Sequence, residues 1–460
     1  MTRTRKNSAK DDAMRLPTTG LTRDEIDQQL QQEATKDVDW KNGKLWTLVY
    51  YAGDDVAEVL GETFKSYLYT NGLGPTAFKS LKRFESEVIA MTANLLGDDN
   101  AIGNMTTGGT ESILMATKAA RDWARDQMPH ITEPNIVVPV TAHPAFDKAA
   151  HYMSVELKHV PIRDDLRVDL DQLEAAITPN TIMLVGSAPN YPYGTIDDIP
   201  KIAGMALARG ILCHVDACLG GFFLPFMTKL RPRGADNTEL NQLPRWDFTV
   251  PGVTSISADL HKYGYSVRGT STINYRSGDL RKYQFFSRAD WPGGLYGSPT
   301  MTGSRPGAAI AASWALMQYL GEDGYLDRVK STMDTTRKLI EGINDIPGLT
   351  VRGEPDMAVL AFGSDEFDCY ALSSAMRKRE WDIERLQRPK NLHLVVTPNH
   401  VSVADQFLSD LREASDEVRD QPATESGEPA IYGALESIED TSNVNDLILN
   451  FIDGLTRLEK

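Results

Sequence analysis

The chain has 460 residues, of which 41% are hydrophobic and 24% are charged. These values are ordinary for a soluble globular protein, and the length exceeds what one hydrophobic core usually organises, so we expect a large domain and a smaller one. With 48 basic and 64 acidic residues the net charge is −16. This balance argues against nucleic-acid binding, because phosphate contacts need a basic face.

The cysteines and the apolar runs bear on the compartment. Cys213, Cys218 and Cys369 form neither a disulfide framework nor a paired zinc motif, so we expect no metal site and a reducing, cytoplasmic compartment. The N-terminus MTRTRKNSAKDDAM lacks the apolar core of a signal peptide. No stretch reaches the roughly 18 uninterrupted apolar residues of a membrane helix, so no transmembrane segment is expected.

Residues 1–80 are interpreted as an N-terminal arm, of which residues 1–20 are expected to be disordered. The segment LTRDEIDQQLQQEA predicts a helix, because Thr22 can cap it and Glu25 follows three residues later, as in a capping box. Residues 37–80 are charged, aromatic and punctuated by glycines.

Residues 81–330 are predicted to form a large domain in which helices and short strands alternate. Helical patterns occur in LKRFESEVIAMTANLL, GGTESILMATKAARDWARDQM and IPKIAGMALARG, and strand patterns in NIVVPV, TIMLVGSA, ILCHVDA, SISADLHK and STINYR. This alternation indicates an α/β fold with a mainly parallel sheet flanked by helices. The pattern changes after a long helix, so residues 331–460 are predicted to form a smaller α+β domain, with a polar loop near residues 419–430 and a last helix.

Three local features could bind a cofactor together. Two glycines precede a helix in TTGGTES, residues 106–112, where backbone N–H groups can bind an anion. Asp216 ends the strand ILCHVDA, at the position where α/β sheets place ligands. Taken singly, a tight turn explains the first feature equally well, and a helix-capping or salt-bridged aspartate is the favoured explanation of the second.

The third feature is Lys262, which lies between SISAD and YGY. A lone lysine is normally a solvated surface group, but this one follows an apolar strand. We therefore expect desolvation to lower its pKa and keep its amine nucleophilic. An anion site, a strand-end carboxylate and a sequestered lysine are together what pyridoxal 5'-phosphate (PLP) needs. His143, in the loop after NIVVPV, could stack on the ring of that cofactor; a loop histidine with one hydrogen bond is the simpler alternative.

At these residues the sequence resembles the PLP-dependent group II decarboxylase family, and most closely its sphingosine-1-phosphate lyase branch. The segments that carry the resemblance are TTGGTESILMATKAARD, HVDACLGGF, GVTSISADLHKYGY, YQFF, DWPGGLYGSPTMTGSRPG, EDGY and AIYGAL. The likeness spans about residues 40–435. It implies the fold-type I, PLP-dependent transferase-like fold and a homodimer whose subunits share their active sites.

The resemblance also implies roles for individual residues. Lys262 resembles the lysine that binds the cofactor covalently, Asp216 the partner of the pyridinium nitrogen, and His143 the ring-stacking residue. Further cofactor contacts are implied for Gly108, Gly109, Thr110 and His261, and for Gly303 and Ser304 toward the cofactor of the neighbouring subunit. Tyr50, Arg268 and Tyr296 resemble residues at the substrate end, and Tyr296 is also a candidate catalytic residue.

Three positions depart from the family pattern. Where the family segment reads NPLHPDIF, this chain has NGLGPTAF, and Gly74 replaces a histidine near the substrate phosphate. Arg268 replaces a second lysine, and an arginine can bind phosphate through its bidentate fork. Tyr193, in PNYPYG, replaces another histidine. These departures leave open whether a substrate phosphate is required.

The resemblance implies a PLP-dependent carbon–carbon lyase that acts on a small-molecule amine. Its reaction would be a retro-aldol cleavage of a phosphorylated sphingoid base to a long-chain aldehyde and phosphoethanolamine. The general base is open among Lys262, Tyr296 and a phosphate oxygen. One alternative is an amino-acid decarboxylase, for which Arg268 or Arg305 could bind the α-carboxylate. The other is a catalytically silent PLP-fold binding protein.

Overall fold

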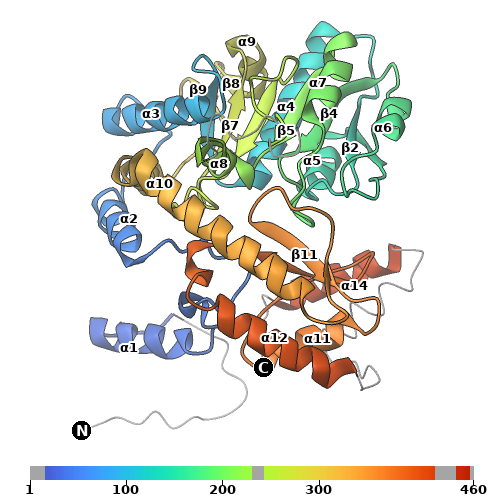
Figure 1. The fold of residues 1–460 in the computed structure, drawn as a ribbon. Coiled ribbons are helices and arrows are strands. Elements are labelled where there is room, and N and C mark those ends of the chain that lie inside the picture. The colour runs from blue at the N-terminus through green and yellow to red at the C-terminus, as the bar shows by residue number, and fades with distance from the viewer. Residues whose placement is uncertain (1–15, 231–242, 420–441, 456–460) are drawn as a thin grey trace.

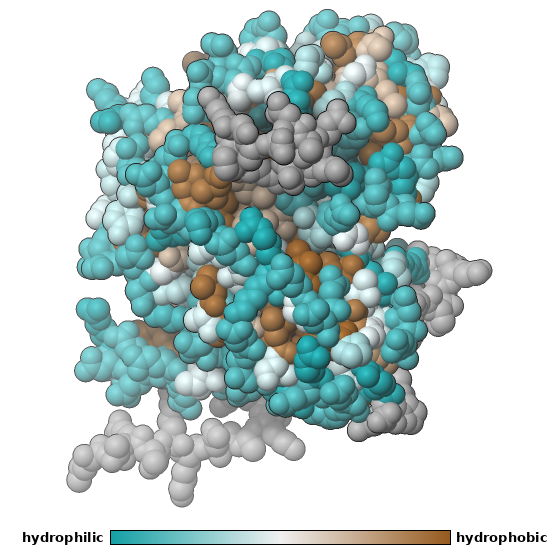
Figure 2. Space-filling view, viewed as in Figure 1, coloured by the Kyte–Doolittle hydropathy of each residue, from teal (hydrophilic) through white to brown (hydrophobic). Residues whose placement is uncertain are grey.

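The computed structural model describes residues 16–230, 243–419 and 442–455, and Figure 1 shows their arrangement. The expected disorder of residues 1–15, the polar loop at residues 420–430 and the AIYGAL segment lie outside the described residues. The face drawn in Figure 2 is mainly hydrophilic, with hydrophobic residues in small separate patches. This distribution fits a chain in which 24% of the residues are charged.

A seven-stranded sheet forms the centre of the large domain, with the order β1-β7-β6-β5-β4-β2-β3. Its strands are β1 (Ile102–Thr106), β2 (Asn135–Pro139), β3 (Glu156–Val160), β4 (Thr181–Ser187), β5 (Leu212–Asp216), β6 (Ser255–Ala258) and β7 (Ser271–Tyr275). Strand β7 is antiparallel to both of its neighbours, and the other pairs are parallel. The prediction of a mainly parallel sheet is confirmed.

Helices cover both faces of this sheet, which explains why β2, β4 and β5 are buried throughout. Ile136 and Val138 of β2 pack with α4 (Gly109–Gln127) and α5 (Ala145–Met153). Val137 packs on the opposite face, in the cluster that includes residues of α7 (Ile199–Ala208), α8 (Leu224–Leu230) and α10 (Gly307–Asn344). The helices on and around the sheet are α3 (Lys79–Leu95), α6 (Leu170–Ala176), α7 (Ile199–Ala208), α8 (Leu224–Leu230) and α9 (Gly278–Arg281).

A long helix, α10 (Gly307–Asn344), connects the large sheet to the C-terminal part of the chain (Figure 1). It is kinked at Gly321, where φ is 54° and ψ is −172°, and glycine adopts a positive φ without steric cost. The helix crosses the boundary expected at residue 330, and the domain limits at residues 80 and 330 stay predictions.

A small antiparallel sheet, with the order β10-β11-β13-β12, forms the C-terminal part. Its strands are β10 (Thr350–Val351), β11 (Val359–Gly363), β12 (Glu384–Leu386) and β13 (Asn391–Val395), and the helices that follow β11 and β13 are α11 (Cys369–Arg377), α12 (Ala404–Arg419) and α14 (Ser442–Leu455). The predicted α+β character of this part is confirmed.

The N-terminal segment has more regular structure than expected. Helix α1 (Arg23–Ala34) begins with the predicted capping box between Thr22 and Glu25. Helix α2 (Asp54–Ser66), which the sequence analysis did not anticipate, packs against α10. The remaining elements are a hairpin of β8 (Phe286–Arg288) and β9 (Tyr296–Ser298) and the short 3-10 helices η1 (Trp40–Asn42), η2 (Gly220–Phe222), η4 (Lys282–Gln284) and η5 (Pro398–His400).

Trp46 anchors the N-terminal segment to the small domain. Its side chain is fully buried, stacks on His400 with ring centroids 4.1 Å apart, and lies 4.4 Å from the ring of Phe407. Its backbone N–H donates to Asp382 O and its carbonyl accepts from Val395 N–H. Residues far apart in the chain therefore share one core.

Replacing this indole should weaken the small domain. We expect Trp46→Ala to cost about 3–5 kcal/mol, the usual penalty for removing a buried aromatic side chain, and to lower the midpoint of urea denaturation followed by circular dichroism. Trp40→Ala, at a partly exposed tryptophan of the same segment, is the control and should shift the midpoint much less. Equal midpoints for Trp46→Ala and the unmodified chain would contradict this account.

Candidate active site

A cavity of about 300 Å³ lies where five strands of the large sheet end. The segments that follow the carboxyl ends of β1, β2, β4, β5 and β6 all contribute to it, as expected for a ligand site in an α/β sheet. Its lining consists of Thr107, Gly108, Gly109, Thr110, Glu111, Ile113, His143, Ser187, Pro189, Tyr191, Asp216, Cys218, Leu219, Asp259, His261 and Lys262. Seven of the predicted site residues therefore meet in one cavity.

Lys262 is paired with a carboxylate in this cavity. Its Nζ lies 3.1 Å from Oδ2 of Asp259, whose side chain is only 1% exposed. Burial lowers the pKa of Lys262, but the charge of Asp259 and the neighbouring Cys218, Tyr50 and Asp216 raise it more, so the pKa lies above its ordinary value. The prediction of a lowered pKa was wrong, because the sequence analysis counted desolvation and did not include the counter-ion.

Asp216 is held by hydrogen bonds at the end of β5. Its Oδ1 accepts from Cys218 N–H (3.1 Å) and from Ser257 Oγ (3.2 Å). Burial raises the pKa of Asp216, but hydrogen bonding to the Cys218 thiol and the charges of His143 and Lys262 lower it more, so the net shift is downward. The carboxylate is therefore ionised at neutral pH and suited to a protonated ring nitrogen.

A buried histidine, His214, is connected to the Asp216 carboxylate through the hydroxyl of Ser257. His214 is fully buried, and burial lowers its pKa to about 4, so the ring is neutral. Its Nδ1 lies 2.9 Å from Ser255 Oγ and its Nε2 lies 3.3 Å from Ser257 Oγ. Because Ser257 uses its single proton toward Asp216, we assign the ring proton to Nε2 of His214.

Two further histidines lie at the cavity wall with fixed orientations. Nδ1 of His143 accepts from Ala145 N–H (3.1 Å), and burial lowers the pKa of this ring. Nδ1 of His261 accepts from Thr270 N–H (3.2 Å), and its Nε2 faces Oδ2 of Asp259 at 3.5 Å. His143 thus lies in the loop after β2, as the sequence predicts, with its Nε2 free of this backbone contact.

The predicted anion site is the start of α4. The helix begins at Gly109, where a Cβ atom would lie 2.8 Å from Sγ of Cys218 and 2.9 Å from Oδ2 of Asp259. Only glycine leaves this approach to the helix N-terminus open. Gly108 and Thr110 flank it in the lining of the cavity, so backbone N–H groups can bind a phosphate here.

Glu111, which the sequence analysis missed, connects this helix start to a distant loop. Its Oε2 accepts from the backbone N–H (2.6 Å) and Oγ1 (2.7 Å) of Thr107, and its Oε1 accepts from Met301 N–H (2.9 Å). The carboxylate therefore ties the anion site to residues 299–304, which carry Gly303 and Ser304.

The remaining predicted contacts lie outside the wall of this cavity. The guanidinium of Arg268 lies 5.4 Å from the ring centre of Tyr50, and burial raises the pKa of Tyr50 to about 12. Tyr296, on β9, contacts the rings of Phe286 and Trp291.

Gly303 and Ser304 follow this hairpin and are likewise absent from the lining of the cavity. A Cβ atom on Gly303 would lie 3.1 Å from the hydroxyl of Tyr296. The Oγ of Ser304 accepts from Nδ2 of Asn71 (3.0 Å). Neither residue contributes to the cavity of its own chain.

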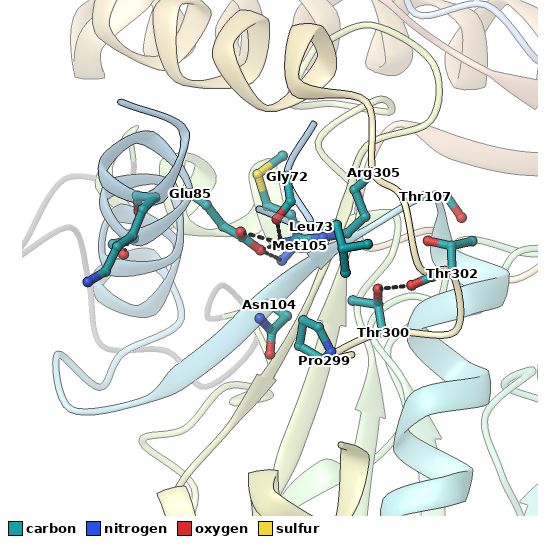
Figure 3. Close-up of polar contacts among 12 residues, drawn as sticks. Gly72, Leu73, Glu85, Asn104, Met105, Thr107, Pro299, Thr300, Thr302 and Arg305 are labelled. Carbon is teal, nitrogen blue, oxygen red and sulfur yellow. Dashed lines mark hydrogen bonds and ion pairs between the residues drawn. The ribbon is translucent and has the colours of Figure 1, made fainter. Parts of the chain in front are cut away.

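Arg305 is bound by a buried ion pair, as Figure 3 shows. Its Nη1 and Nη2 donate to the two carboxylate oxygens of Glu85 (2.5 and 2.9 Å), and Nη2 also donates to Gly72 O (3.0 Å). Glu85 in addition accepts from Met105 N–H (3.1 Å). Arg305 lines a second cavity of about 570 Å³. It is therefore not available in the first cavity for the carboxylate that the decarboxylase alternative requires.

Several residues that line the cavity were not predicted, although the sequence contains a local pattern that indicates some of them. Tyr193, singled out in PNYPYG, is buried and absent from the cavity wall, whereas its neighbour Tyr191 lines the cavity and donates to Oε2 of Glu384 (3.2 Å). Asp259 precedes Lys262 by three residues, so an acidic partner at turn spacing was a usable signal. No local pattern marks Ser187 or Leu219.

The residues of the first cavity fit PLP. They supply an amine, an ionised carboxylate, an imidazole at the cavity wall and a glycine-lined helix start, and Oδ1 of Asp259 is buried without a hydrogen-bond partner. Among the described residues, His, Cys, Asp and Glu form no group of three or more that could hold a metal ion. Across the same residues, no helix combines the length and apolar character needed to cross a membrane.

Closing the helix start should weaken cofactor binding. We expect Gly109→Ala to weaken PLP binding at least tenfold, because its Cβ would collide with Cys218 and Asp259 where the phosphate needs space. The measurement is a titration of the cofactor-free protein with PLP, followed by absorbance. Gly204→Ala is the control, because Gly204 lies in α7 with no atom within 4 Å of the new Cβ. Unchanged affinity in Gly109→Ala would contradict the assignment.

Comparison with known proteins agrees with this site. The family described as "Pyridoxal-dependent decarboxylase conserved domain" matches residues 7–364. The sphingosine-1-phosphate lyase of Arabidopsis thaliana is 43% identical over 449 residues, which cover 95% of this chain and 80% of the plant protein. The structure of a Burkholderia pseudomallei sphingosine-1-phosphate lyase superposes with a TM-score of 0.88 at 36% identity, covering 97% of this chain and 98% of the other. A Lactobacillus brevis glutamate decarboxylase, 20% identical, shares the fold with a TM-score of 0.76 over 90% of this chain and 97% of the other.

The chain therefore belongs to the pyridoxal-dependent decarboxylase family, the class of enzymes that this fold and cavity define. Within that family it groups with the sphingosine-1-phosphate lyases. It is a PLP-dependent lyase, as the resemblance in the sequence implies.

Proposed function

We propose that the protein cleaves the C2–C3 bond of a phosphorylated sphingoid base by a retro-aldol reaction, giving a long-chain aldehyde and phosphoethanolamine. The observation that carries the proposal is the convergence of Lys262, Asp216 and His143 in one cavity of a chain that groups with lyases of this name. The catalytically silent alternative loses support, because it predicts that at least one of these groups is missing.

The residues of the cavity have distinct roles in this proposal. PLP, when bound, supplies an electron sink for the bond that breaks. Lys262 would hold the cofactor covalently, and the helix start at Gly109 would bind its phosphate. Asp216, ionised and fixed by Ser257 and Cys218, would keep a proton on the ring nitrogen, and His143 would lie against the ring.

The proton balance requires one acceptor and one donor. The acceptor takes the proton of the C3 hydroxyl as the C2–C3 bond breaks, and the donor returns a proton to C2. Tyr50 is a poor acceptor, because burial raises its pKa to about 12 and the phenol keeps its proton at neutral pH. Lys262, Tyr296 and a phosphate oxygen remain the candidates for the proton acceptor.

We also infer a homodimer with shared active sites. The support is that Tyr296, Gly303 and Ser304 lie outside the cavity of their own chain, on a hairpin and loop with exposed apolar side chains. Phe286 is 56% exposed, Trp291 51% and Leu295 88%. A second copy of the chain would bury these side chains at an interface. The loop that carries Gly303 and Ser304 would then reach the cavity of that second copy.

A cytoplasmic location belongs to the same proposal. Its support is the state of the cysteines, because Cys213, Cys218 and Cys369 are all free and buried. Buried thiols that form no disulfide suit a reducing compartment.

Product analysis tests the proposed function. The PLP-loaded protein would be given a sphingoid-base phosphate and, separately, a panel of amino acids, with long-chain aldehyde and CO₂ measured by mass spectrometry and radiometry. We expect aldehyde and phosphoethanolamine in equal amounts, and none from Lys262→Ala. CO₂ from an amino acid without any aldehyde would replace the proposal by decarboxylation.

A substitution at position 74 tests how the substrate phosphate is recognised. Asn71, three residues earlier, donates to Ser304 and accepts from Arg305 N–H, so this segment lies beside the loop assigned to the partner's site. A Cβ on Gly74 would meet only Ala77 and Phe78 at 3.8 and 3.9 Å, so a side chain fits.

We expect Gly74→His to lower KM for the phosphorylated substrate by roughly tenfold or more, the effect of one charge-assisted hydrogen bond of about 1.5–3 kcal/mol. KM for the unphosphorylated base should stay unchanged. Gly61→His is the control, because Gly61 is exposed on α2 with open space around it. If Gly74→His had the same KM for both substrates, the segment around residue 74 would not contribute to recognition of the substrate phosphate.

A further inference from the structure

We propose that Asp259 is a positioning residue that makes Lys262 the proton carrier of the reaction. Once the substrate amine has displaced it, Lys262 accepts the C3 hydroxyl proton and then delivers a proton to C2. This inference deepens the proposed retro-aldol function and rests on it.

The placement of Asp259 is the first support. Its side chain is 1% exposed, its Oδ2 lies 3.1 Å from Nζ of Lys262, and its Oδ1 is buried without a hydrogen-bond partner. The turn that joins the two residues is closed by Lys262 N–H donating to Asp259 O (3.4 Å), and Asp259 N–H donates to Cys218 O (3.3 Å). A buried carboxylate with one oxygen unpaired is costly to keep, so it needs a partner that carries charge.

The charges around Lys262 favour its protonated form. The carboxylate of Asp259 faces it from the same turn, and the carboxylate of Asp216 faces it from the end of β5. Cys218 and Tyr50 are also neighbours, but burial raises the pKa of both, so the thiol and the phenol are neutral at neutral pH. The charges of His143 and His261 interact with that of Lys262, and burial lowers the pKa of both rings. Arg268 interacts with Asp259, and burial lowers its pKa as well. The amine of Lys262 is therefore a strong base, and its ammonium form has a fixed counter-ion.

Asp216 is less suited than Asp259 to act as the counter-ion of Lys262. Its Oδ1 is already bonded to Ser257 and Cys218, and its proposed partner is the ring nitrogen. The two carboxylates therefore have different roles. Asp216 would stabilise the protonated ring nitrogen of the cofactor, and Asp259 stabilises the positive charge of the Lys262 ammonium.

The proton steps then balance within one residue. The O–H bond at C3 breaks and an N–H bond forms at Nζ of Lys262, the C2–C3 bond breaks and leaves its electron pair on C2, and the aldehyde departs. The N–H bond then breaks and a C–H bond forms at C2. Lys262 ends as the neutral amine that can attack the cofactor again, and neither an oxidant nor a second acid is needed.

The first test measures Lys262 in the cofactor-free protein, without substrate. Acetic anhydride would label lysines over a range of pH, with each site quantified by peptide mass spectrometry. We expect Lys262 to resist labelling until high pH, and Asp259→Asn to move its midpoint down by roughly 1–3 pH units, the usual effect of losing an adjacent opposite charge. Asp259→Glu, which keeps the charge, should stay close to the unmodified chain.

The chain offers a matched control. Asp279 and Lys282 have the same spacing of three residues and an Nζ–Oδ1 distance of 2.7 Å, but both are exposed to solvent. Asp279→Asn should leave the labelling of Lys282 almost unchanged, because solvent screens exposed pairs. If Asp259→Asn fails to fold, labelling of Lys262 in the unmodified chain decides: a midpoint at or below that of the exposed lysines overturns the proposal.

The second test concerns turnover. In the PLP-loaded enzyme, we expect Asp259→Asn to lower kcat for aldehyde formation at least a hundredfold with KM nearly unchanged, and Asp259→Glu to recover part of it. An unshifted labelling curve in Asp259→Asn overturns the inference even if aldehyde is made. A shifted curve with normal kcat overturns the proton-carrier role. If the unmodified enzyme makes no aldehyde, the proposed function fails instead, and the labelling result still reports on the ion pair.

Discussion

The chemistry of this chain depends on one geometric constraint, which is that parallel strands end at a common edge. Strands β1, β2, β4, β5 and β6 all point their carboxyl ends toward the same cavity. Each contributes one short segment, so residues from positions 107 to 262 line the same cavity. The buried strands fix the backbone, and the polar groups at their ends determine the charge of the site.

The second organising feature is the contact between the large domain and the small sheet next to Lys262. The hydroxyl of Tyr263 lies 3.1 Å from Ala358 O and 2.9 Å from Val396 O, and its ring packs against Tyr50 at 5.0 Å. The turn that carries Lys262 is thus attached to the C-terminal sheet and to the N-terminal segment. Packing of three separate parts of the chain therefore determines where the reactive amine lies.

Much of the fold and the centre of the site could be predicted from the sequence, because they depend on local signals. Apolar runs indicated the strands, and strand-end or helix-start positions placed Asp216, Gly109 and His143. Contacts between distant segments left no local signal: Arg305 pairs with Glu85, 220 positions away in the chain, and α2 is held by α10. The sign of the pKa shift of Lys262 was missed for a related reason, since it depends on the balance of burial against several charges.

The attachment of the turn around Lys262 has a mechanical consequence. Lys262 O accepts from Tyr265 N–H (2.9 Å), and Tyr263 is fixed on the small sheet, so the backbone at this position has little room to move. The amine can then travel only by rotation about the bonds of its own side chain, which is fast compared with domain motion. The reach of the amine is therefore set by the four methylene groups of its side chain, measured from a backbone that two other parts of the chain hold in place.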